Sequence, residues 1–220
     1  MKTNYIKEVT IKRKEHIKAN EQCQQALLIF VKNPVLGHVK TRLAQSVGHE
    51  EALNIYKALL EHAHSVTRTV EGCERIVYYS QDIVSEDIWD TSLFQKNKQA
   101  SGDIGERMQS AFLEAFQRGM EQVVLIGSDC PKLSPSHIEA AFQALNHYDV
   151  VYGPALDGGY YLIGLNKPQP LLFDLSAWSS SNVLAESIRI CSENGLKLRL
   201  LEALPDVDYI ADWEAHGWAL

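Results

Sequence analysis

Two short apolar runs place the strongest limit on how this chain can fold. Residues 26–32 are apolar up to the final Lys32, and residues 123–126 read Val-Val-Leu-Ile. A strand with one face in water alternates apolar and polar residues, so uninterrupted runs of this length indicate strands that are buried on both faces. Such strands occur mainly in parallel sheets covered by helices. The sequence therefore predicts a central, mainly parallel sheet.

Helical patterns separate these runs. Between residues 53 and 63, apolar residues recur at spacings of three and four, as on the buried face of a helix. Further helices are predicted at 104–118, 136–146 and 182–194, and further strands at 75–80, 122–127, 149–153, 160–165 and 197–201. Alternating strands and helices are typical of a three-layer α/β/α sandwich, here a Rossmann-like one.

Length and charge narrow the classes of protein that fit. The 220 residues suit one domain, predicted at 26–220, preceded by a basic extension at 1–25 in which residues 1–20 contain six Lys or Arg and two Asp or Glu. The formal net charge of −7 argues against nucleic acid as a partner. No apolar stretch reaches the roughly 18 residues of a membrane span, and no secretory signal is evident, so we expect a cytoplasmic protein.

A basic loop follows the first predicted strand. Residues 32–42 read Lys-Asn-Pro-Val-Leu-Gly-His-Val-Lys-Thr-Arg. Loops at the carboxyl ends of parallel strands bind ligands in open α/β sheets. Lys32, Lys40 and Arg42 could neutralise a diphosphate, and Gly37 would let the backbone approach it. The spacing is not that of a P-loop, so a solvated basic turn is the alternative interpretation.

Acidic residues follow later predicted strands. Asp129 lies in Gly-Ser-Asp-Cys-Pro, directly after the apolar run at 123–126, where a carboxylate suits Mg²⁺ or Mn²⁺; the alternative is that it caps the next turn. Asp157, Gly158 and Gly159 separate two predicted strands, either as a hairpin turn or as a place where a ligand's sugar meets backbone amides. Asp157 could then act as a base.

Two weaker segments complete the prediction of a site. Gly-Asp-Ile-Gly-Glu-Arg at 102–107 reads as a capped helix start, from which Arg107 could reach a phosphate. Asp206 and Asp208 lie two residues apart after the last predicted strand, so in extended geometry both face the same way. Asp208 could complete a metal site, or both carboxylates could be solvated.

Taken in order, these segments resemble one family. VKNPVLGHVKTRLA at 31–44, GDIGERM at 102–108, VVLIGSDCPKLSP at 123–135 and DVVYGPALDGGYYLIGL at 149–165 are similar to the DUF2064 family, related to arsenosugar-biosynthesis glycosyltransferases within the nucleotide-diphospho-sugar transferase superfamily. The resemblance covers residues 26 to about 214. It implies a GT-A-like fold that holds a sugar nucleotide at the carboxyl edge of the sheet.

The resemblance also implies roles for residues that this chain supplies. Asp129 is the expected metal and diphosphate carboxylate, although Ser-Asp-Cys-Pro departs from the DxD motif of the wider superfamily, and Asp208 is the candidate second ligand for Mg²⁺ or Mn²⁺. The expected phosphate-binding residues are Lys32, Gly37, Lys40, Arg42 and Arg107. The expected sugar or acceptor residues are Asp157, Gly158 and Gly159, with Asp157 and Asp129 catalytic.

Three functions are compatible with these residues. The first is transfer of a sugar from a nucleoside diphosphate to a small-molecule acceptor, with the metal and the basic loop stabilising the departing diphosphate. The alternative is nucleotidyl transfer, in which a phosphorylated small molecule attacks the α-phosphate of a nucleoside triphosphate, because related folds perform both reactions. A third is a sugar-nucleotide sensor without catalytic activity.

Overall fold

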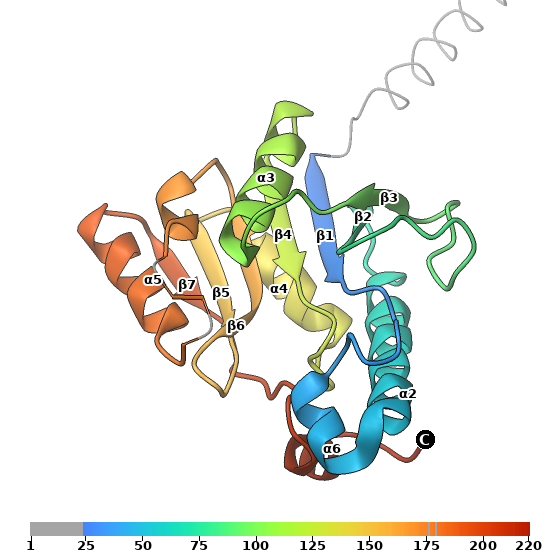
Figure 1. Cartoon of the computed structure of the whole chain (residues 1–220). Helices are drawn as coiled ribbons and strands as arrows, with labels where there is room; N and C mark the ends of the chain where they lie inside the picture. Colours follow the sequence, from blue (N-terminus) through green and yellow to red (C-terminus); the bar gives the residue numbers. More distant parts are fainter. Residues whose placement is uncertain (1–23, 176, 179) are drawn as a thin grey trace, which may run out of the picture.

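The computed structural model describes residues 24–175, 177–178 and 180–220, and these contain one seven-stranded sheet. The strands are β1 (Gln25–Val31), β2 (Glu74–Tyr79), β3 (Gln95–Lys98), β4 (Gln122–Ile126), β5 (Val150–Pro154), β6 (Tyr160–Leu165) and β7 (Leu198–Leu200). The helices are α2 (Thr41–Thr67), α3 (Ile104–Gln117), α4 (Pro135–Ala144), α5 (Val183–Glu193), α6 (Ile210–His216) and the 3₁₀ turn η1 (Pro170–Phe173) (Figure 1).

The strand order is β3-β2-β1-β4-β6-β5-β7. β1 pairs in parallel with β2 and with β4, so the two apolar runs lie side by side at the centre of the sheet. β6 is antiparallel to both β4 and β5, because it returns from β5 through a hairpin. The mainly parallel sheet predicted from the sequence is confirmed, with β6 as the strand that runs the other way.

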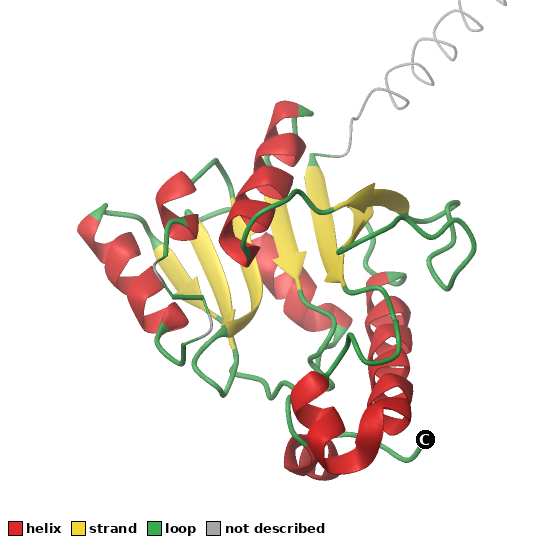
Figure 2. Ribbon diagram, in the orientation of Figure 1, coloured by secondary structure: helices red, strands yellow, loops and turns green. Residues whose placement is uncertain are grey.

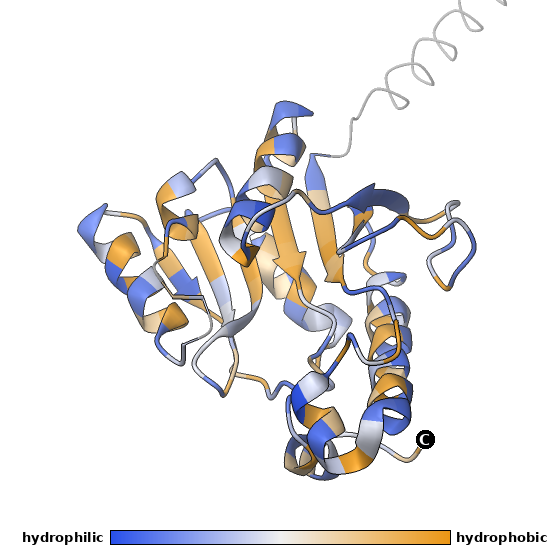
Figure 3. Cartoon of the chain, viewed as in Figure 1, coloured by the Kyte–Doolittle hydropathy of each residue, from blue (hydrophilic) through white to orange (hydrophobic). Residues whose placement is uncertain are grey.

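Helices cover both faces of the sheet (Figure 2). One face packs against α2 and α4, in a core that includes Ile29, Tyr56 and Ile138. The other packs against α3, α5 and η1 in a second core that includes Leu28 and Phe112. Both central strands are therefore buried on both sides, as their uninterrupted apolar sequences predict. Figure 3 shows the hydrophobic colouring of these strands. The arrangement is the expected three-layer α/β/α sandwich.

The beginning of α2 and the end of the chain form a third, smaller cluster. Gly48, at φ 83° and ψ 165°, interrupts α2 and separates a short first segment from the long helix. That first segment packs with Val207 and, through partly buried side chains, with Ile210 and Trp213 of α6. The cluster brings residues 207–213 beside the loop that leads into α2, more than 150 positions earlier in the sequence (Figure 1).

Three elements lie where no helix or strand was predicted. β3 reads Gln-Lys-Asn-Lys and has no apolar pattern, because within the described sheet it is an edge strand whose single neighbour is β2. The 3₁₀ turn η1 and the short helix α6 contain too few residues to show helical periodicity. α2 is also much longer than the stretch at 53–63 that predicted it.

The predicted division of the chain falls largely outside the described residues. Of the extension predicted at 1–25, only residues 24 and 25 are described, and Gln25 already belongs to β1. Across the residues described, we find no helix with the length and apolar character that crossing a bilayer requires.

Candidate functional site

The basic loop connects the end of β1 to the start of α2. Gly37 adopts φ 79° in a turn where the His38 amide donates to the Val35 carbonyl at 3.0 Å. Val39 is buried and anchors the loop, while Lys32 and Arg42 are exposed. The loop thus emerges from the carboxyl end of a central parallel strand, where open α/β sheets bind their ligands.

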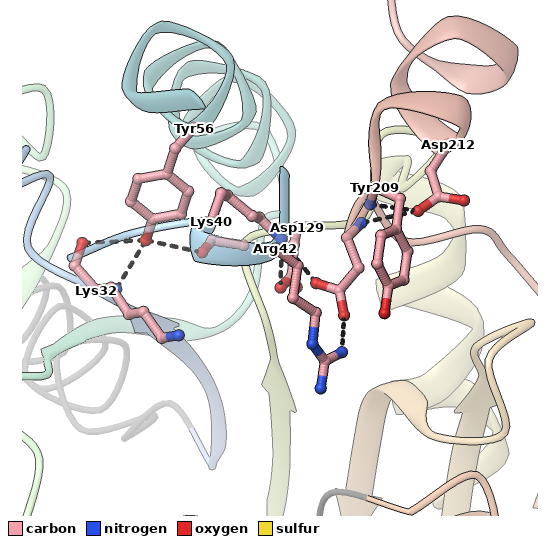
Figure 4. A network of polar contacts seen from close by, with 9 residues as sticks. Lys32, Lys40, Arg42, Tyr56, Asp129, Tyr209 and Asp212 are labelled. Carbon is pink, nitrogen blue, oxygen red and sulfur yellow. Dashed lines mark hydrogen bonds and ion pairs between the residues drawn. The ribbon is translucent and has the colours of Figure 1, made fainter. Parts of the chain in front are cut away.

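Lys40 lies between two carboxylates at this edge. Its side chain is only 7% exposed, and its Nζ lies 3.1 Å from Asp129 Oδ2 and 3.6 Å from Asp208 Oδ1. Arg42 Nη1 lies 2.6 Å from the other oxygen of Asp208. The structure therefore brings together four of the residues predicted for the site, from three separate segments of the chain (Figure 4).

Tyr56 of α2 connects the two strands that carry these groups. Its hydroxyl donates to the Lys32 carbonyl at 3.0 Å, accepts from the Lys32 amide at 2.8 Å, and lies 3.3 Å from Ser128 Oγ (Figure 4). Burial raises the pKa of Tyr56, so the hydroxyl stays neutral. The sequence predicted Tyr56 only as an apolar helix position, because a phenol ring fits that pattern whatever its hydroxyl contacts.

Asp129 follows β4 in a turn and remains about half exposed. The Lys40 ammonium holds the pKa of Asp129 below its ordinary value and outweighs the desolvation that would raise it. The more distant Lys32 also lowers this pKa. The carboxylate is therefore ionised at neutral pH. The backbone carbonyl of Asp129 accepts from the Val207 amide at 3.1 Å, which ties this turn to the last predicted site segment.

The segment that holds Asp208 is itself fixed by α6. Asp212 Oδ2 accepts from the amides of Asp208 at 3.0 Å and Tyr209 at 2.7 Å, an arrangement that caps the start of the helix (Figure 4). Val207, between Asp206 and Asp208, is fully buried. This alternation agrees with the prediction that the two carboxylates share a face.

Asp206 is a site residue whose setting the sequence did not reveal. Desolvation raises the pKa of Asp206 to about 6, and the charges of Asp157, Asp129 and Asp208 add to the effect. Four carboxylates thus converge on this edge of the sheet, with Lys40 and Arg42 among them. The Asp-x-Asp spacing was visible in the sequence, but the crowding depends on how the segments fold together.

This crowding gives a pH-dependent stability. Because the folded-state pKa of Asp206 lies above the ordinary value of 3.8, folding favours the protonated carboxyl, and stability is lost as pH rises from about 4 through 6. We expect Asp206→Asn to raise the free energy of unfolding by about 1–2 kcal/mol at pH 7.5, and by much less at pH 4.5. Urea unfolding at the two pH values measures this.

Asp82→Asn is the matched control, because the Asp82 side chain is 89% exposed and pairs at the surface with Lys98. It should change the free energy of unfolding little at either pH. An Asp206→Asn protein less stable than the wild type at pH 7.5 would contradict the assignment of Asp206 to a crowded acidic cluster.

The Asp-Gly-Gly segment is the turn of the hairpin between β5 and β6. Asp157 Oδ1 accepts from the Gly159 amide at 2.8 Å, and Gly158 adopts φ 95°. The turn also contacts two other segments, because the Gly158 carbonyl accepts from the Leu184 amide at 3.1 Å and the Leu156 amide donates to the Leu204 carbonyl at 3.1 Å. Asp157 is exposed and close enough to raise the pKa of Asp206.

Arg107 does not join this group. It lies in the first turn of α3, and its Nε donates to the Gly102 carbonyl at 2.8 Å, close to the Asp103 and Glu106 capping box predicted from the sequence. Among the described residues it forms no hydrogen bond or ion pair with Lys40, Arg42 or the carboxylates. Phosphate binding by Arg107, sugar or acceptor binding by Gly158 and Gly159, and catalysis by Asp157 therefore stay predictions.

The donor set fits a divalent ion that arrives with a substrate. Within residues 24–175, 177–178 and 180–220, no three His, Cys, Asp or Glu side chains are arranged to hold a metal by themselves. Asp129 and Asp208 nevertheless face one cationic position, which the Lys40 ammonium takes. Mg²⁺ commonly binds through one or two carboxylates together with substrate phosphates and water, and two carboxylates are what this edge supplies.

Comparison with known families identifies the chain. The model of DUF2064, described as an uncharacterized protein conserved in bacteria, matches residues 63–180, more than half of the sequence. The chain belongs to the DUF2064 family. The matched region of this DUF2064 protein holds Asp129 and the Asp-Gly-Gly turn, while the basic loop and Asp208 lie outside it.

Solved structures support the same placement. A protein from Desulfovibrio desulfuricans G20, provisionally named a nucleotide-diphospho-sugar transferase, is 30% identical with a TM-score of 0.77, over 87% of this chain and 85% of that one. 4-Diphosphocytidyl-2C-methyl-D-erythritol synthase from Anaerococcus prevotii is 13% identical with a TM-score of 0.55, over 88% and 94% of the chains, and shows the fold alone. The DUF2064 protein thus has the fold expected from its sequence.

A curated relative carries a more specific name. The 2-phospho-L-lactate guanylyltransferase of Methanocaldococcus jannaschii is 27% identical over 149 residues, which is 66% of this chain and 62% of the relative. The chain spans about three fifths of the length of the curated relatives it matches.

Proposed function

We propose that this protein is a nucleotidylyltransferase that joins a nucleoside triphosphate to a phosphorylated small molecule. The observation that carries the proposal is the similarity to guanylyltransferases, which covers 60–66% of this chain. The site supports it, because Lys40 and Arg42 pair with Asp129 and Asp208 at the carboxyl edge of the sheet, and Lys32 is near enough to help lower the pKa of Asp129. This reading takes precedence over the sugar transfer that the sequence suggested first.

The reaction requires binding of a polyphosphate and stabilisation of its departing charge. A phosphate oxygen of the acceptor forms a bond to the α-phosphorus, the bond from that phosphorus to the bridging oxygen breaks, and pyrophosphate leaves with the electron pair. Lys40 and Arg42 would bind the triphosphate, as point charge and as planar fork respectively, and would stabilise pyrophosphate as it departs. Lys32, exposed at the end of β1, would add to the same positive field.

Asp129 and Asp208 would hold Mg²⁺ or Mn²⁺ together with the phosphates. When bound, such an ion neutralises phosphate charge and orients the reacting groups. Tyr56 would fix the positions of Lys32 and the Asp129 turn through its three contacts. It would thereby keep the cationic and anionic groups at a constant distance from each other. Asp157, exposed at the hairpin turn, would face the acceptor side.

The proposal is tested by measuring pyrophosphate release. The purified chain is incubated with each of the four nucleoside triphosphates, guanosine triphosphate first, with Mg²⁺ or Mn²⁺ and a set of phosphorylated hydroxy acids and phosphorylated sugars. Acceptor-dependent pyrophosphate release with one triphosphate is the expected result. No release with any triphosphate across the acceptor set would overturn the proposal.

Sugar transfer from a nucleoside diphosphate is the second candidate. It is favoured by the similarity to the Desulfovibrio protein, whose provisional name is nucleotide-diphospho-sugar transferase. A thermal-shift screen separates the two, since a ligand that binds the native state alone raises the melting temperature. Metal-dependent stabilisation by a diphosphate sugar and by no triphosphate would favour sugar transfer.

A further inference from the structure

The Lys40 ammonium occupies the position between two carboxylates that come from different parts of the chain. Asp129 follows β4, and Asp208 precedes α6. The Lys40 side chain is 7% exposed and its Nζ lies within 3.6 Å of an oxygen of each carboxylate. The protein's own ammonium group, with one positive charge, thus lies between the carboxylates of Asp129 and Asp208 (Figure 4).

The backbone of Lys40 is strained in a way that fits this placement. Lys40 adopts φ 44° and ψ 48°, and in the part of the chain that the structure describes it is the sole residue other than glycine with a positive φ. The left-handed conformation is unfavourable for a residue with a Cβ, because the Cβ approaches the following carbonyl oxygen. Strain of this kind persists where surrounding contacts hold the residue, and Lys40 is held by the two ion pairs of its ammonium and by its carbonyl, which accepts from the Ala44 amide at 2.9 Å.

We propose that Lys40 is an exchangeable internal cation, which stands in for the divalent metal in the free protein and moves to the substrate's phosphates when the metal enters. The inference rests on the proposed function, which supplies both the metal and the phosphates. An ammonium and a divalent ion repel strongly at a separation of a few ångströms, so both cannot lie between the same two carboxylates. The incoming phosphates give the displaced ammonium a new anionic partner.

Two consequences follow from this exchange. The free protein binds a divalent metal weakly, because the metal must first displace a buried and paired ammonium. Metal and nucleotide then bind cooperatively, since the nucleotide accepts the ammonium that the metal expels. Lys40 is a positioning residue in this scheme as well as a phosphate ligand.

The experiment measures Mn²⁺ binding to the whole chain without nucleotide or acceptor. Free Mn²⁺ is followed by electron paramagnetic resonance during titration of the wild type and of Lys40→Met, Lys40→Arg and Lys98→Met. Lys98→Met is the matched control, because it removes the same charge at an exposed surface pair with Asp82. We expect Lys40→Met to bind Mn²⁺ about tenfold more tightly than the wild type, and the other two variants to stay within about twofold.

A second change locates the effect. Adding Asp129→Asn to Lys40→Met should reverse the gain, because the metal then loses one of its two carboxylates. Mn²⁺ binding by Lys40→Met that is no tighter than by Lys98→Met would overturn the exchange. Should Lys40→Met fail to fold by circular dichroism, Lys40→Gln takes its place, and a folded Gln variant without tighter binding overturns the inference equally.

The titration is independent of the reaction. Tighter Mn²⁺ binding in a chain that releases no pyrophosphate would keep the exchange and reject nucleotidyl transfer. Unchanged Mn²⁺ binding in a chain that does release pyrophosphate would reject the exchange alone.

Discussion

Asp129→Asn is expected to lower acceptor-dependent pyrophosphate release by about 100- to 1,000-fold, the range observed when a group that stabilises transition-state charge is removed. The change keeps the size of the side chain and removes its negative charge. The Asp129 carboxylate is the nearer of the two that pair with Lys40, with Oδ2 3.1 Å from Nζ. It is also one of the two proposed metal ligands. Both the metal and the ammonium would therefore lose their main anionic partner.

The fold should survive this change. Asp129 is about half exposed, Lys40 keeps Asp208, and the hydrogen bond from the Val207 amide to the Asp129 carbonyl does not involve the altered group. Far-UV circular dichroism and urea unfolding check the fold, and Asp82→Asn, at an exposed position, controls for loss of a surface carboxylate. Turnover within about tenfold of the wild type would reject Asp129 as a catalytic residue.

The centre of the fold follows from local sequence, and its edges do not. β1 and β4 are uninterrupted apolar runs, so their burial on both faces could be predicted without knowing their neighbours. β3 is polar throughout and becomes a strand because β2 offers it an unpaired edge. The sequence pattern predicts only part of α2, because Gly48 divides the helix and its first segment packs on α6 and not on the sheet.

In the site, too, some features follow from local sequence and others depend on tertiary contacts. Lys40 and Asp129 could be placed together because each follows a central parallel strand, and the carboxyl ends of such strands meet at one edge. The hydroxyl contacts of Tyr56 and the crowding around Asp206 could not be predicted, since both depend on segments that are far apart in the sequence. The sequence predicts Asp208 as a candidate second metal ligand, but its pairing with Arg42 and Lys40 depends on the tertiary structure.

The hairpin turn at Gly158 links the stability of the chain to the geometry of the site. A Cβ added at Gly158 would lie 2.0 Å from the Ser181 carbonyl oxygen, a backbone atom, and the residue adopts φ 95°. The turn also holds Leu204 through the Leu156 amide, two residues before Asp206. Any shift of the turn that relieves the contact therefore moves Asp157 relative to Asp206.

Gly158→Ala should lower the free energy of unfolding by about 2–4 kcal/mol, since it combines backbone strain with overpacking. Gly195→Ala separates the two causes: Gly195 has φ 65° but open space around the added Cβ, so it should lose only about 1 kcal/mol. Urea unfolding measures both, and pyrophosphate release should fall in Gly158→Ala alone. Equal losses of stability would mean that conformational strain, and not the contact with Ser181, sets the requirement for glycine at this turn.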